Sequence, residues 1–170
     1  MFKIRQVCKN DNLNLSIVIR EVLIEIGVPK KGTAFSDPQL DFMFETYDKK
    51  RSIYYVVENN GKIYGGAGIS PLNQADYNIC ELQKMYFLPS IRGIGLGNKM
   101  IEKCLGFALD NKFKYCYIET LPYMKAAQKL YLKKEFYYID GPIGNTGHTS
   151  CNVWLMKKLK LLNGCPMAGW

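Results

Sequence analysis

The chain has 170 residues, of which 48% are hydrophobic and 22% charged, and this composition suits one soluble globular domain with its own core. No apolar run reaches the roughly 18 residues that a membrane span needs, and no apolar signal segment follows the first residues, so we expect a cytoplasmic protein without a membrane partner. The formal net charge of +8 favours an anionic partner but does not distinguish a nucleotide from a nucleic acid. The single histidine, His148, excludes a two-histidine metal site, and the six scattered cysteines indicate neither a metal site nor a disulfide framework.

Alternating and helical periodicities in the sequence predict eleven secondary-structure elements. Asn59-Asn60-Gly61 is a hairpin signal, Gly65-Gly66 inside the next strand predicts a bulge or a close backbone approach, and Asp37-Pro38 is typical of a helix start. The expected order β-α-α-β-β-β-α-β-α-β-β indicates an α+β fold, with a mixed and mostly antiparallel twisted sheet of about seven strands flanked by about four helices. The predicted elements span residues 2–7, 13–26, 37–47, 52–58, 62–69, 77–88, 95–111, 115–119, 124–134, 136–139 and 153–157, with a loop at 32–36, in a single domain of residues 1–162 followed by a tail of residues 163–170.

The segment Arg92-Gly93-Ile94-Gly95-Leu96-Gly97 lies where an apolar strand pattern ends and a helical pattern begins. Backbone amides at a helix start have no partner within the helix, and glycines let a phosphate approach them closely. A dinucleotide-binding fingerprint would need glycine in place of Asn98, and the phosphate loop of nucleotide triphosphatases would need Lys and then Ser or Thr directly after Gly97. Because neither pattern fits, the segment predicts a pyrophosphate site of another kind.

Several linked motifs resemble the GNAT superfamily of acetyl-CoA-dependent N-acetyltransferases, whose pyrophosphate loop reads Arg/Gln-x-x-Gly-x-Gly/Ala. Residues 81–89 resemble the fourth strand of that family, residues 92–97 its loop, and residues 117–120 its fifth strand. The resemblance covers about residues 2–160. The last helix of the family and the turn after it resemble the motif Ala127-x-x-Leu130-Tyr131-x-Lys133-x-x-Phe136.

Two positions depart from the family pattern. Met124 stands where the family often has an asparagine that touches the cofactor. Glu135 stands where the family often has a glycine before the final phenylalanine, and this departure concerns a turn more than chemistry.

The resemblance implies acetyl-CoA as the co-substrate, no metal, and direct attack of a primary amine on the thioester in a ternary complex. It implies that Tyr131 protonates the departing thiolate and that Glu81 is the first candidate for the base, with Glu119, His148 or water as the other candidates. An amide of the fourth strand near Phe87 would stabilise the oxyanion. The implied cofactor-binding residues are Met85, Tyr86 and Phe87 on the strand, Arg92, Gly93, Ile94, Gly95, Leu96, Gly97 and Asn98 in the loop, and Ala127 and Tyr131 on the last helix.

Other interpretations stay open from the sequence. Glu81 also fits a salt-bridged strand residue, Tyr131 a packed aromatic, and the glycine segment a tight turn without a ligand. The alternative function is a non-catalytic acyl-CoA-binding regulatory module. A nucleic-acid-binding domain is disfavoured, because basic and aromatic residues do not interleave as a stacking surface requires.

The acceptor is expected to be a small-molecule or peptide amine, and a homodimer is one expectation because family members frequently form dimers. By resemblance, the acceptor would meet residues 29–47 and 138–151. An aromatic wall with a carboxylate would suit a small primary amine, but the same residues also fit core packing and helix caps. These two segments hold the aromatic residues Phe35, Phe42, Phe44, Tyr47 and Tyr138 and the acids Asp37, Asp41, Glu45 and Asp140.

Overall fold

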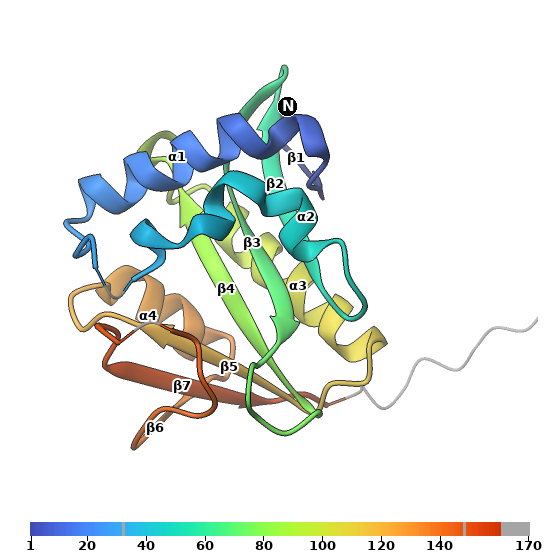
Figure 1. The fold of residues 1–170 in the computed structure, drawn as a ribbon, viewed down its shortest axis with the longest axis vertical. Helices are drawn as coiled ribbons and strands as arrows, with labels where there is room; N and C mark the ends of the chain where they lie inside the picture. The colour runs from blue at the N-terminus through green and yellow to red at the C-terminus, as the bar shows by residue number, and fades with distance from the viewer. Residues whose placement is uncertain (32, 148, 161–170) are drawn as a thin grey trace, which may run out of the picture.

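The computed structural model describes residues 1–31, 33–147 and 149–160, which build one sheet of seven strands in the order β1-β2-β3-β4-β5-β7-β6 (Figure 1). Neighbouring strands run antiparallel except for β4 and β5, which run parallel. The predicted α+β fold with a mostly antiparallel sheet is confirmed. The strands are β1 (Lys3–Gln6), β2 (Ile53–Asn59), β3 (Lys62–Pro71), β4 (Ile79–Phe87), β5 (Tyr115–Thr120), β6 (Tyr137–Ile139) and β7 (Val153–Lys158).

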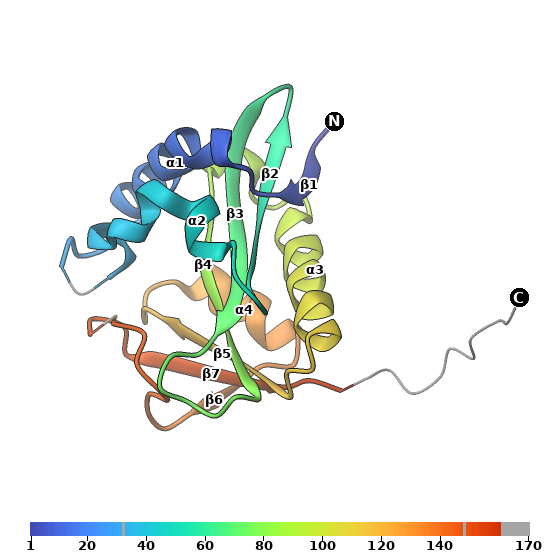
Figure 2. The ribbon, with the colours of Figure 1, turned by 45° about the vertical axis from the view of Figure 1, so that its right-hand side comes forward.

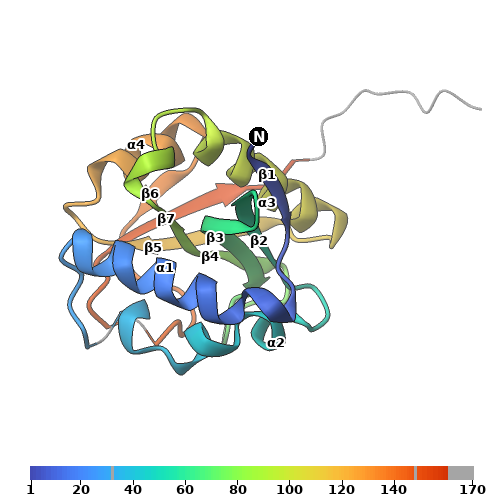
Figure 3. The same ribbon diagram turned by 90° about the horizontal axis from the view of Figure 1, so that it is seen from above.

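Helices cover both faces of the sheet. The helices α1 (Asn12–Glu25) and α2 (Met43–Tyr47) lie on one face, and α3 (Leu96–Asp110) and α4 (Lys125–Lys133) lie on the other (Figure 2, Figure 3). Within the described ranges, no helix combines the length and the apolar character that crossing a membrane would require. The described residues also form four short 3-10 turns: η1 (Lys9–Asp11), η2 (Ala34–Ser36), η3 (Pro38–Phe42) and η4 (Pro89–Ile91).

Each helical layer packs an apolar stripe against its own face of the sheet. Leu15, Ile19 and Leu23 follow one another at intervals of one helical turn, and all three are fully buried in the core beneath α1. On the opposite face, α3 buries the broad stripe that its sequence predicts, and Tyr131 of α4 joins the same cluster. The buried members of the α3 stripe are Met100, Ile101, Cys104, Leu105 and Ala108.

The segment that precedes β2 differs from the sequence-based expectation. Residues 34–36, expected as loop, form η2, and the single helix expected over residues 37–47 is divided into η3 and α2. The division falls at Phe42, whose φ of −134° and ψ of 45° lie outside the helical region. The predicted start is confirmed, because the Asp37 carboxylate accepts a hydrogen bond from the Gln39 amide at 2.9 Å. Gly32, residues 161–162 of the expected domain and the expected tail at 163–170 lie outside the described residues.

The two glycine signals of the β2–β3 hairpin are confirmed. Asn60 and Gly61 have φ of 51° and 78°, the left-handed conformation that a tight hairpin turn requires. A register shift with β2 lies beside Gly65, and a side chain there would collide with the backbone of Tyr86 and Phe87 in β4. This close approach presses β3 against the carboxyl-terminal half of β4.

The strands β4 and β5 separate soon after they begin. They are paired only from Ile79 opposite Tyr115 to Glu81 opposite Tyr117. Beyond that point β4 continues beside β3 to Phe87, while β5 stays with β7, so the two strands diverge toward their carboxyl ends (Figure 1). The divergence leaves a V-shaped opening in the middle of the sheet, where backbone N–H and C=O groups of β4 face no neighbouring strand.

Candidate functional site

The glycine segment leads into the first turn of α3 beside this opening. Gly93 and Gly95 have φ of 77° and 86°, and Gly95 is the N-cap residue of α3. An added Cβ at either position would meet nothing within 4 Å, so glycine is required there for backbone conformation rather than for space. A helix that begins at Leu96 leaves its first N–H groups without partners inside the helix, and these groups attract an anion.

A cleft of about 470 Å³ runs from the glycine segment along β4 to α4. The N–H of Leu88 bonds to Tyr64 of β3 at 2.9 Å, and because an antiparallel ladder alternates sides, the N–H of Phe87 points the other way, into the opening. Of the residues that the resemblance implies for the cofactor, Ile94, Gly95, Leu96 and Asn98 do not line the cleft. Those that line it are Met85, Tyr86, Phe87, Arg92, Gly93, Gly97, Ala127 and Tyr131.

Arg92 is engaged by protein groups. Its Nε donates to the carbonyl oxygen of Phe87 at 2.9 Å, and its two terminal nitrogens bind the Glu25 carboxylate at 3.0 and 2.5 Å. Since Glu25 is the last residue of α1, the ion pair fastens that helix to the start of the glycine segment. Local sequence patterns do not reveal this partner, because the two residues are 67 positions apart.

A small cavity of about 40 Å³ lies between the diverging strands and shares lining residues with the cleft. Glu81, the last β4 residue paired with β5, and Tyr131 of α4 both line it. Tyr131 also lines the cleft, and Glu81 also lines a larger polar pocket on the other side. Met124 lines the cavity and the cleft, so the departure from the family pattern falls inside the site. The two residues predicted as acid and base therefore line one cavity, and each also lines one of the two larger spaces.

Glu81 is held in a buried and oriented state. The side chain is 4% exposed, and burial, together with a smaller effect of the nearby Glu119 charge, raises the pKa of its carboxyl to about 7. Its Oε2 accepts a hydrogen bond from Gln83 Nε2 at 2.6 Å, and Gln83 Oε1 in turn accepts one from the Tyr47 hydroxyl at 2.8 Å. A carboxyl with a pKa near 7 is suited to exchange a proton at neutral pH.

The other two predicted candidates for the base differ from Glu81. Glu119 accepts hydrogen bonds from the Tyr117 hydroxyl at 2.7 Å and from Thr146 Oγ1 at 2.5 Å, so one of its oxygens is engaged by β5 and the other by the loop that follows β6. His148 lies outside the described residues. Of the two carboxylates, Glu81 is therefore the better placed to accept a proton.

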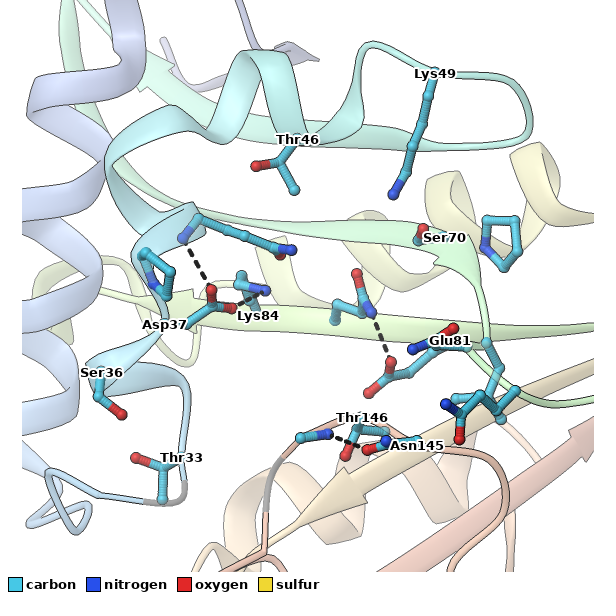
Figure 4. A pocket seen from close by; sticks show the side chains of 18 of the residues that line it. Thr33, Ser36, Asp37, Thr46, Lys49, Ser70, Glu81, Lys84, Asn145 and Thr146 are labelled. Carbon is cyan, nitrogen blue, oxygen red and sulfur yellow. Dashed lines mark hydrogen bonds and ion pairs between the residues drawn. The ribbon is translucent and has the colours of Figure 1, made fainter.

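A polar pocket of about 710 Å³ opens on the α2 side of the sheet (Figure 4). Figure 4 shows Asp37 and Lys84 side by side at one end and Glu81 further along β4, beside Asn145 and Thr146. Both segments that the resemblance implies for the acceptor contribute to its wall. Of the nine residues singled out in those segments, only Asp37 lines it.

Six of the other residues singled out in these segments have structural contacts elsewhere. The aromatic ring of Tyr47 is buried against Tyr54 with centroids 5.1 Å apart, and Phe42 is 60% exposed. For several of these residues the alternative interpretation, a role in core packing or helix capping, is therefore the one that the structure supports. Asp41 pairs with Arg20 at 2.7 Å, Glu45 accepts from Asn12 at 2.7 Å, Tyr138 donates to Gln128 at 3.0 Å, and Phe35 and Phe44 pack on the core beneath α1.

Two polar residues of the pocket, Gln83 and Lys84, were not singled out from the sequence. A signal existed, because two adjacent polar residues interrupt the apolar alternation between Leu82 and Met85. The structure explains the interruption by a β-bulge, at which the register between β3 and β4 shifts around Ala67.

Three features of this structure are together typical of the class of GNAT-like acetyltransferases. They are the divergence of β4 and β5, the start of α3 directly after the glycine segment, and the cleft and polar pocket on either side of the cavity. The Acetyltransferase (GNAT) family matches residues 21–136, and the chain belongs to this family. The uncharacterized N-acetyltransferase YjgM of Escherichia coli (strain K12) is 42% identical over 156 residues, which cover 91% of this chain and 93% of that protein.

Solved structures show the same fold at low sequence identity. A GNAT acetyltransferase from Staphylococcus aureus Mu50 is 21% identical, with a TM-score of 0.83 over 94% of this chain and 100% of that chain. The PaiA N-acetyltransferase from Thermoplasma acidophilum, solved in complex with coenzyme A, is 14% identical, with a TM-score of 0.72 over 93% of this chain and 99% of that chain. The resemblance seen in the sequence motifs is confirmed.

Acetyl-CoA is the acetyl donor of the GNAT family. The residues of this chain fit such a donor, because an elongated cleft with a free strand edge ends at a helix start suited to a pyrophosphate. Among the residues that the structure describes, no group of three or more His, Cys, Asp or Glu side chains is placed to hold a metal ion.

Proposed function

We propose that this protein moves an acetyl group from acetyl-CoA to a primary amine by direct attack in a ternary complex. The observation that carries the proposal is that Glu81 and Tyr131 line one cavity, which joins the cleft to the polar pocket. The donor then enters from the cleft and the acceptor from the pocket. Their reacting ends meet between a base and an acid.

The donor would lie between β4 and α4. The amides at the start of α3 favour its pyrophosphate, and the strand edge at Met85 to Phe87 favours its pantetheine arm in the manner of an added strand. The N–H of Phe87 would stabilise the negative charge that develops on the carbonyl oxygen. Arg92 supports this edge through the Phe87 carbonyl, and the hydrogen bonds recorded among the described residues use three of its five N–H donors, which leaves two for a phosphate.

Glu81 would act as the general base for the acceptor. A lysine-like amine with a pKa near 10.4 is neutral in only about one molecule in 2,500 at pH 7, so a base at the site increases the reactive fraction. Glu81 takes one proton from the bound ammonium. The lone pair of the resulting amine forms the C–N bond at the acetyl carbonyl carbon, and the second proton that the nitrogen loses passes to solvent.

Tyr131 would act as the general acid for the leaving group. The C–S bond breaks, the electron pair goes to sulfur, and the hydroxyl of Tyr131 donates its proton to the thiolate. Tyr131 is 5% exposed, and burial raises the pKa of its phenol above the ordinary value, so the acid is fully protonated when the thiolate forms. Solvent then returns the proton from Glu81 to the phenolate side of the site. No covalent acetyl-enzyme is required.

Calorimetry and a thiol-release assay test the proposal. We expect acetyl-CoA to bind at micromolar concentration and free CoA to appear when members of a panel of amines, polyamines, amino acids and aminoglycosides are added. Absence of binding at high micromolar acetyl-CoA would overturn both this proposal and the alternative of a regulatory module. Tight binding without turnover of any amine would establish the acyl-CoA-binding module instead.

A further inference from the structure

Lys84 occupies an unusual position for a lysine. It lies in the middle of β4 with a φ of 50°, a left-handed conformation that disfavours any residue with a Cβ by about 1 kcal/mol. The bulge is fixed by the buried Tyr54, whose hydroxyl donates to the Lys84 carbonyl oxygen at 2.8 Å. In a regular strand the Lys84 side chain would lie on the face opposite to Glu81 and Gln83, yet it lines the same pocket as both. The bulge thus directs a lysine into the polar pocket.

The ammonium of Lys84 is buried but incompletely paired. Its side chain is 4% exposed, and Nζ lies 2.8 Å from Asp37 Oδ2. Asp37 Oδ1 is used elsewhere, as the cap of η3. An ammonium has three N–H donors, and within the described ranges Asp37 is the one partner recorded for it. Because a buried charge is costly unless its donors are satisfied, the remaining donors call for an acceptor group in the pocket.

The charges around the pocket also favour an anionic group. Lys49 and Lys50 from the loop after α2 line it on the exposed side, and Figure 4 shows Lys49 directed toward it. Together with Lys84 they outnumber the acids Asp37 and Glu81 of its lining. A purely cationic acceptor, such as a polyamine, would be disfavoured by this excess of positive charge.

From this geometry we infer that the acceptor is an amine that also carries a carboxylate, with the carboxylate bound by Lys84 and the amine facing Glu81. The inference rests on the proposed function and names its acceptor class. Glu81 and Lys84 lie three residues apart on β4 and line the same pocket, so a single acceptor can reach both. An amino acid carries in one molecule the amine and the carboxylate that these two residues would bind. Lys84 is then a specificity residue, whereas Glu81 performs the proton transfer.

Matched acceptors test the inference directly. We compare amino acids with the amines that remain after removal of the carboxylate and with the corresponding amides, each as kcat/KM per neutral amine, using L-phenylalanine, phenylethylamine and L-phenylalaninamide as one such set. We expect the amino acid to exceed both analogues by about 10-fold or more, the size of effect that a hydrogen bond to a charged group supports. A preference for the decarboxylated amine would overturn the inference.

Variants at the ion pair identify the residue responsible. In Lys84→Met the ratio of amino acid to decarboxylated amine should fall toward one through a rise in KM, whereas Lys84→Arg should retain a ratio above one. Asp37→Asn keeps a helix-capping side chain and removes the competing carboxylate, so the ratio should hold or rise. If Asp37 instead bound the acceptor amine, KM would rise in Asp37→Asn. Survival of the full ratio in Lys84→Met would overturn the inference.

Two controls separate folding and function from specificity. Lys3→Met removes an exposed lysine on the outer strand β1 and should leave the ratio at its original value. Melting temperature and acetyl-CoA affinity are measured for every variant, and if Lys84→Met does not fold, the Lys84→Arg and Asp37→Asn ratios decide. Turnover of amines without any carboxylate preference would overturn this inference alone. Acetyl-CoA binding without turnover of any acceptor would overturn it together with the proposed function.

Discussion

The cleft beside α3 and the polar pocket beside α2 adjoin one another at Glu81, yet they are built in different ways. The cleft comes from three stretches of chain, the β4–loop–α3 unit, the start of α4 and the end of α1, and its recognition groups are largely backbone amides. The pocket comes from β4, η3, the loop after α2, the β3–β4 connection and residues 145–147, and its recognition groups are side chains. A donor site made of backbone tolerates sequence change so long as the chain can adopt its conformation. An acceptor site made of scattered side chains can change with single substitutions.

The largest effect on kcat is expected at Glu81, where the cleft and the polar pocket adjoin one another. Glu81→Gln keeps the size and one hydrogen-bonding oxygen of the side chain but removes the base, so kcat should fall about 10²- to 10³-fold with little change in acetyl-CoA affinity. Steady-state kinetics and calorimetry measure the two quantities. Glu119→Gln is the matched control, and a larger loss in that variant than in Glu81→Gln would transfer the role of base to Glu119.

The pH dependence of the wild-type enzyme sharpens the same assignment. Burial raises the pKa of Glu81 to about 7, and only the ionised form accepts a proton, so kcat/KM should rise with pH through about 7 and then level off. An acceptor amine of low pKa is needed, because otherwise its own ionisation would hide the step. The step should be absent from the residual activity of Glu81→Gln. A profile of identical shape in that variant would contradict the assignment.

A smaller effect on kcat is expected at Tyr131, the proposed acid for the leaving group. Tyr131→Phe removes one hydroxyl from a packed ring, and kcat should fall about 10- to 100-fold while acetyl-CoA affinity changes little. Tyr123→Phe is the control, since Tyr123 also lines the cleft but its hydroxyl contacts only the Gly27 carbonyl oxygen, at 3.4 Å, among the described residues. Equal kcat in Tyr131→Phe and wild type would rule out Tyr131 as the acid.

A change in the glycine segment at the start of α3 should weaken donor binding and leave the pocket intact. Gly95→Ala introduces a Cβ where φ is 86°, so the loop must shift, and acetyl-CoA affinity should fall about 10-fold although no neighbour is crowded. Gly106→Ala on the same helix is the control, because a Cβ there also meets nothing and φ is helical. Calorimetry that gives the same dissociation constant for both variants would show that the glycine segment does not hold the donor.

The smallest effect is expected at a residue that belongs to neither space. Glu135 has a φ of 62° at the turn where the family often has glycine, and the carboxylate that it offers to Lys157 is on an exposed side chain. Glu135→Gly should therefore raise the melting temperature by about 2 °C, since it relieves the left-handed conformation and loses only a weak surface pair. Lys129→Gly in the exposed interior of α4 should lower the melting temperature. A lower melting temperature in Glu135→Gly would mean that the Lys157 pair outweighs the strain.

Sequence reasoning succeeded where the signal was local. The hairpin at Asn60-Gly61, the cap at Asp37 and the helix that follows Gly95 depend on neighbouring residues, so spacing alone reveals them. It failed over residues 37–47, where one helical pattern is divided at Phe42. Nothing local marks that break, because the chain turns there to lie beneath α1 and over β2.

The donor half of the candidate site was predictable for the same reason, and the acceptor half was not. The residues from Met85 to Gly97 are contiguous, and eight of the residues predicted for the cofactor line the cleft. The pocket brings Asp37, Glu81 and Lys84 together from β4 and a segment more than 40 residues away, and Lys84 enters it only through a bulge. Pattern analysis places Lys84 on the wrong face, since it assumes regular alternation.

The sequence by itself determined the order of the elements, the family motifs and the glycine segment whose positive φ values begin α3, because each follows from local propensity and spacing. Only the tertiary structure decided the rest: the divergence of β4 from β5, the burial that raises the pKa of Glu81, the capture of Arg92 by Glu25 and the pairing of Lys84 with Asp37. Each of these depends on which distant segments meet. Burial and long-range pairing set the energies of charged groups, and neither is a property of a residue and its neighbours along the chain.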